Sequence, residues 1–124
     1  MTERQLVILG ALMMLIGVGA GAFGAHGLKR VLSADMLAIW QTAVLYQLVH
    51  ALGIILIAAL STRIGGTLPG WSGLIMFAGI VLFSGSLYIL ALSGVKWLGA
   101  VTPLGGVAFI VAWALLMIAA WRHL

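Results

Sequence analysis

Four apolar runs, none of which contains Asp, Glu, Lys or Arg, constrain this chain more than any other feature of its sequence. They cover residues 6–25, 39–60, 71–92 and 103–121. About 20 helical residues, each rising 1.5 Å, cross a hydrocarbon layer about 30 Å thick. The runs therefore predict four transmembrane helices, an all-α integral membrane four-helix bundle formed by one domain, residues 1–124.

The composition excludes a soluble domain. Hydrophobic residues make up 65% of the 124-residue chain and charged residues only 6%, whereas about 25% of a soluble domain is charged. The net charge of +4 comes from basic residues scattered between the apolar runs, which is typical of residues that flank membrane spans and not of a nucleic-acid surface. The chain has no cysteine, which excludes disulfides and thiolate metal sites.

Residues between the runs indicate where helices begin and end. Ser33 is placed to cap the second helix, with Asp35 in its first turn near the positive end of the helix dipole. The other predicted boundaries are a break at residues 68–70, C-terminal glycines at Gly27 and Gly94, and a cap and first helical residue at Thr102 and Pro103.

Aromatic and basic residues near the ends of the runs bear on membrane placement. The tryptophans expected to anchor at the interface are Trp40, Trp71, Trp97 and Trp121. Four crossings place both termini on one side of the membrane, but each side receives three basic residues, so charge does not decide the orientation. We favour cytoplasmic termini. A cleaved signal peptide is a poor alternative for the first run, because that run is long and Arg4 stands beside Glu3.

Small residues form a stripe along the first predicted helix. Four glycines spaced seven, four and three residues apart fall within about 60° of one another on a helix, namely Gly10, Gly17, Gly21 and Gly24. Such a stripe predicts close packing of a neighbouring helix. A similar line on the fourth helix begins at Gly105 and continues through alanines. These faces either close the bundle within one chain or pair separate chains. A four-helix chain this small is expected to need both, so we predict a homo-oligomer or a subunit of a membrane complex.

The same glycines contain the spacing G-x-G-x-x-G at Gly19, Gly21 and Gly24. A nucleotide site with this spacing follows a strand and opens a helix that faces water. Here the spacing ends a membrane helix, so nucleotide binding is not favoured.

Hydrogen-bonding side chains follow one face of the second run. Thr42, Tyr46 and His50 recur every four residues, with Gln47 at the edge of that face. An unsatisfied polar group in hydrocarbon costs several kcal/mol, so we expect Tyr46, Gln47 and His50 to face the interior. The candidate polar-site residues are His50, Tyr46, Gln47, Thr42, Ser84, Tyr88, His26 and Thr102.

Four interpretations of this polar face are open: a fixed hydrogen-bond network, a cavity for a small solute or a proton, a metal or haem site, and a catalytic site. His26 and His50 differ in depth by roughly 15 Å, which does not suit a shared metal. No span holds a carboxylate, which disfavours catalysis and ion-coupled transport. We expect no catalytic residue, no metal and no cofactor, and two function classes remain: a structural or accessory membrane protein, or a solute- or proton-binding one.

Four segments together resemble a known family: GAFGAHGLK, WQTAVLYQLVHALG, LFSGSLYILAL and VTPLGGVAFIVAWALL. They are similar, in the same order, to the domain-of-unknown-function 423 family of small bacterial inner-membrane proteins, which human transmembrane protein 256 also resembles. The resemblance implies a four-span bundle in the bacterial plasma membrane and implies no activity. It covers almost the whole chain, and the polar face of the second run lies inside the matching segments.

Overall fold

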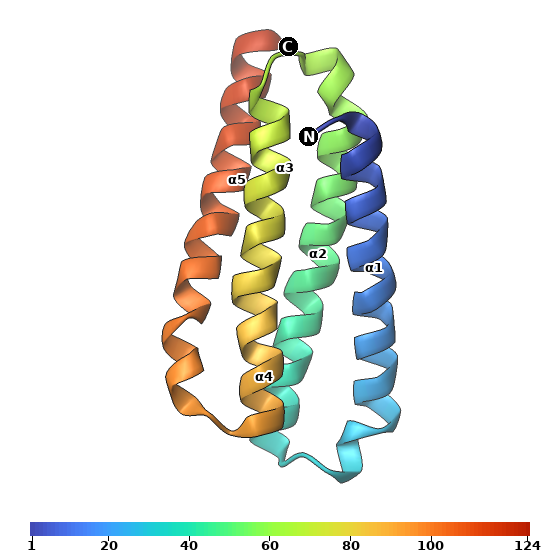
Figure 1. The fold of residues 1–124 in the computed structure, drawn as a ribbon, viewed down its shortest axis with the longest axis vertical. Coiled ribbons are helices and arrows are strands. Elements are labelled where there is room, and N and C mark those ends of the chain that lie inside the picture. The colour runs from blue at the N-terminus through green and yellow to red at the C-terminus, as the bar shows by residue number, and fades with distance from the viewer.

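The computed structural model describes residues 1–124 and contains four helical crossings long and apolar enough to span a membrane (Figure 1). The first two crossings are α1 (Glu3–His26) and α2 (Ala34–Ile64). The third is continuous and consists of α3 (Leu68–Gly79), the π-helical segment η2 (Ile80–Gly85) and α4 (Ser86–Ser93); the fourth contains α5 (Thr102–His123). Two short 3-10 turns, η1 (Leu28–Arg30) and η3 (Lys96–Ala100), complete the chain. The predicted all-α membrane bundle is confirmed.

The crossings are not equally buried. The second and third are the central ones, while α1 lies along α2 and α5 lies along the third crossing at the opposite side (Figure 1). The outer crossings bury 22% of their most apolar stretch, against 44% and 39% for the second and third. Both termini lie at one end of the bundle (Figure 1). Two helices therefore present broad apolar faces outward.

Two of the predicted helix boundaries are confirmed. The Ser33 hydroxyl accepts a hydrogen bond of 3.2 Å from the Met36 amide and caps α2. Gly94 ends α4 in the left-handed conformation, with φ of 73°, which costs glycine little because it has no Cβ.

Gly27 directly follows α1, as predicted, but its φ of −98° is not left-handed, and the chain continues from it into η1. The remaining predicted boundaries are wrong in detail. The break before the third crossing lies at Gly65 and Gly66, both with positive φ, and α3 already begins at Leu68. Thr102 is the first residue of α5 and not its cap, so its hydroxyl is free to bond elsewhere.

The four glycines of the α1 stripe lie against α2 of the same chain. A Cβ added to Gly17 would come within 2.8 Å of the Leu48 side chain, and one added to Gly24 within 2.5 Å of the Trp40 ring. Real Cβ atoms do not approach other atoms this closely, so the missing side chains allow the contact. Gly10 makes the same kind of approach to Ile55, whereas a Cβ on Gly21 would lie 3.2 Å from the Val44 side chain, a tight contact that a small shift could relieve.

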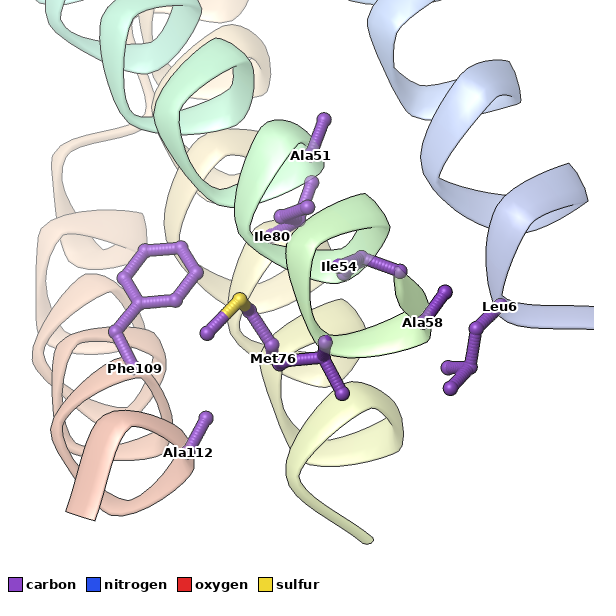
Figure 2. Packing of buried hydrophobic residues seen from close by; sticks show 9 residues of the cluster. Leu6, Ala51, Ile54, Ala58, Met76, Ile80, Phe109 and Ala112 are labelled. Carbon is purple, nitrogen blue, oxygen red and sulfur yellow. The ribbon is translucent and has the colours of Figure 1, made fainter. Parts of the chain in front are cut away.

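The largest apolar core joins the central crossings to both outer helices. Figure 2 shows Phe109 and Ala112 on α5 facing Met76 of α3, with the α2 side chains between them and Leu6 of α1. The full cluster is Leu6, Ala51, Ile54, Ile57, Ala58, Met76, Ile80, Phe109 and Ala112. One set of interlocking side chains therefore fixes the positions of all four crossings.

Candidate functional site

Gln47 is the centre of the polar interior. Only 2% of its surface is exposed. Its amide nitrogen donates to the Met13 carbonyl of α1 at 2.9 Å, and its amide oxygen accepts from the Tyr88 hydroxyl of α4 at 2.7 Å. Gln47 thus bonds to two other crossings at once. The sequence analysis places Gln47 at the edge of the polar face formed by Thr42, Tyr46 and His50. This is wrong, because the buried face of α2 is centred near Gln47.

Serine hydroxyls join the other helix pairs through backbone carbonyls. Ser84 of η2 donates to the Ala43 carbonyl of α2 at 2.7 Å, and Ser72 of α3 donates to the Ala112 carbonyl of α5 at 2.7 Å. Both serines are fully buried. Each bond satisfies a hydroxyl in a place that water does not reach.

A second polar contact lies at one end of the bundle. The Thr102 and Ser86 hydroxyls are 2.7 Å apart and join α5 to α4. His26, at the last turn of α1, is exposed and takes no part in it. No fully buried side-chain nitrogen or oxygen anywhere in the protein lacks a hydrogen-bond partner.

Trp40 belongs to this interior network. It was expected to anchor at the membrane interface, and this is wrong: its surface is 7% exposed, and its indole nitrogen donates to the Ala20 carbonyl of α1 at 2.9 Å. Its ring also packs against the Tyr88 ring, with 4.6 Å between centroids. Trp71, Trp97 and Trp121 remain exposed near the ends of their helices.

His50 is buried, but only one of its ring nitrogens has a protein partner. Its surface is 6% exposed, and Nδ1 lies 2.8 Å from the backbone carbonyl oxygen of Tyr46. A carbonyl only accepts, so Nδ1 carries the proton, and Nε2 of the neutral ring is an acceptor. The ring lies on that of Phe109, with 3.6 Å between centroids and 11° between planes.

Tyr46 does not face the interior as predicted. Its surface is 39% exposed, and its hydroxyl has no protein partner. Its ring contacts that of Phe83 at 4.4 Å between centroids. Thr42, one turn away, is also exposed, and its hydroxyl donates to the Ala38 carbonyl of its own helix. The predicted polar face of α2 is therefore the rim of the buried face. The centre of the buried face lies at Gln47, one position after Tyr46.

A lateral groove lies over this rim. It is lined by Leu45, Tyr46, Val49 and His50 and has a volume of about 250 Å³. His50 lies near the middle of α2, so the groove opens sideways at a depth where lipid chains surround the protein. The sequence analysis correctly places Tyr46 and His50 on the same face of α2. It does not predict that both residues line one groove on the outer surface of the bundle.

The sequence reasoning missed Trp40, Ser72 and Ser86 as members of the polar network. Ser72 and Ser86 carry the same signal as Ser84, a hydroxyl within an apolar run, and the rule that such groups need partners applies to them equally. No three His, Asp or Glu side chains are grouped as a metal site would require.

Comparisons with known proteins identify related chains. The family described as "Protein of unknown function (DUF423)" matches residues 20–106. The chain is 50% identical over 125 residues to the UPF0382 membrane protein YwdK of Bacillus subtilis, covering 98% of this chain and 99% of the relative. It is 50% identical over 116 residues to a UPF0382 membrane protein of Staphylococcus epidermidis, covering 94% of each. No solved structure matches the chain.

Proposed function

The chain belongs to the DUF423 family of membrane proteins of unknown function, and from that premise we propose that it has a structural or accessory role in the bacterial plasma membrane. It acts by contact of its outer helices with other transmembrane helices, either further copies of the chain or subunits of a larger complex. The observation that carries this proposal is the closed interior, in which every fully buried side-chain nitrogen and oxygen is bonded within the protein.

Two glycines on the outer helices support the proposal. A Cβ added to Gly19 of α1 or Gly106 of α5 would meet nothing within 4 Å. A helical glycine costs about 1 kcal/mol relative to alanine, and no contact within the chain offsets that cost at these positions. Close approach of a helix from another molecule would offset it, as small residues allow in membranes.

We expect Gly19→Leu or Gly106→Leu to reduce assembly without changing the melting temperature, because a large side chain keeps a second helix at a distance while the chain's own fold is undisturbed. Native mass spectrometry of the protein released from lipid nanodiscs gives the number of chains. Ala59→Leu is the control, since Ala59 is an exposed small residue on the central helix α2 and is not a glycine. An unchanged mass distribution in both outer-face variants would contradict the proposal.

A second candidate function is binding of a small solute or a proton. It is favoured by Nε2 of His50, which lies near the middle of α2 without a protein partner. Such a function needs water to reach His50 from one side of the membrane. The two candidates therefore differ in whether the polar centre of the bundle is dry.

A further inference from the structure

We propose that the lateral groove beside His50 binds a membrane-soluble molecule that carries a neutral hydroxyl on an apolar body. The groove is lined by Leu45, Tyr46, Val49 and His50. This inference does not depend on the structural role proposed above, since it concerns what occupies the groove and not which helices meet at the outer faces.

The first polar group of the proposed site is Nε2 of His50, which is a hydrogen-bond acceptor. The side chain is more than nine-tenths buried, and Nε2 is not bonded to any protein atom. Every fully enclosed nitrogen in the protein has a partner, so this unpartnered atom is reachable from outside, and His50 lines the groove. An unsatisfied polar group in hydrocarbon costs several kcal/mol. Lipid tails carry no donor, so a bound molecule with an O–H group satisfies Nε2 where acyl chains do not.

Tyr46 supplies the second polar group. The Tyr46 side chain also lines the groove, and its hydroxyl has no protein partner. A phenol both donates and accepts. A hydroxyl on the ligand matches this pair, because it can donate to Nε2 of His50 and accept from Tyr46.

The remaining features of the groove define the rest of the ligand. Leu45 and Val49 provide aliphatic walls, and both are about half exposed, so they suit an apolar body that continues into the lipid. The volume of about 250 Å³ accommodates a small head group, below the range of about 300–1,000 Å³ that is usual for drug-sized ligands. No Asp, Glu, Lys or Arg lies in the apolar run that carries the groove, so a charged ligand would lack a counter-charge at a depth where charge is costly.

The hydroxyl has two possible sources, a phenolic ring or an aliphatic alcohol, and three probes separate them. The full chain, labelled with ¹⁵N-histidine in nanodiscs, is titrated with 4-hexylphenol, 1-decanol and 4-hexylanisole, the last being the methyl ether of the phenol without its donor. We expect the His50 Nε2 resonance to move upfield with one or both hydroxyl probes and to stay in place with the ether. Loss of one hydrogen bond predicts binding of the ether about 2- to 10-fold weaker than the phenol.

Protein variants test the same site. Tyr46→Phe keeps the ring and removes the hydroxyl, and we expect it to weaken binding of the hydroxyl probe about 2- to 10-fold. Thr42→Val is the matched control with no expected effect, because the Thr42 hydroxyl already bonds to its own helix. A shift with only one hydroxyl probe identifies the source of the hydroxyl.

Three results would overturn the proposal. The first is equal binding of all three probes with no movement of the Nε2 resonance, which means simple partition into an apolar surface. The second is an Nε2 resonance already at its hydrogen-bonded position before any probe is added, which means that water or another protein chain occupies the groove. The third is no binding of any probe.

Discussion

Replacing Gly105 with alanine is expected to destabilise the bundle by about 1–3 kcal/mol, the usual cost of forcing extra volume into a packed interior. Gly105 of α5 lies against the backbone of η2, and a Cβ there would come within 2.7 Å of the Phe83 Cα. A flexible side chain could move aside, but the backbone of a helix cannot do so without separating the two crossings. Equilibrium unfolding in mixed micelles measures the loss.

The neighbouring glycine provides the control. A Cβ on Gly106 meets nothing within 4 Å, so Gly106→Ala is expected to be neutral or to stabilise the isolated chain by up to about 1 kcal/mol through helix propensity. The two variants make the same chemical change one residue apart. Equal effects of the two substitutions would show that α5 does not approach η2 through Gly105.

Replacing Gln47 with leucine is expected to cost about 1–3 kcal/mol, because the substitution removes two interhelical hydrogen bonds and leaves the Tyr88 hydroxyl without a partner. Leucine has a similar volume and suits an apolar environment, so the loss reports hydrogen bonding more than packing. Gln47 is 2% exposed, and water does not replace the missing amide. The free energy of unfolding in mixed micelles is again the measurement.

A double-mutant cycle distinguishes this network from a general packing effect. Tyr88→Phe removes the other half of the Gln47–Tyr88 bond, so the double variant leaves neither group of that bond unpaired. We expect it to be less destabilised than the sum of the single variants, with a coupling energy of about 0.5–1.7 kcal/mol. Additive effects would mean that the two side chains do not bond in the membrane.

The fold was predictable from the sequence because the bilayer restricts it so strongly. Uncharged runs of sufficient length leave only transmembrane helices as an option, and the caps at Ser33 and Gly94 act locally, so short sequence patterns identify them. The break at Gly65 and Gly66 was missed because the proline at residue 69 is equally compatible with the first turn of a helix.

The candidate site was predictable only in part, because the rotation of α2 about its axis depends on packing. If the centre of the buried face is moved by one position along the helix, the predicted face turns by about 100° about the helix axis. That difference places Gln47 at the centre of the network and Tyr46 at the rim. The burial of Trp40 was also hidden, because a tryptophan near the end of a span is typical of an interface anchor, and only the contact with Gly24 and the Ala20 carbonyl shows otherwise.

The central claim is that water does not reach the polar centre of this bundle, whereas His50 opens sideways to lipid. Solid-state NMR with polarisation transferred selectively from water or from lipid chains tests it directly in a bilayer. The account predicts no early water-derived signal at the Gln47 side chain or at His50, a clear lipid-derived signal at His50, and strong water transfer to the exposed His26. Rapid water transfer to Gln47 or His50, comparable to that at His26, would contradict the account and favour a solute or proton path.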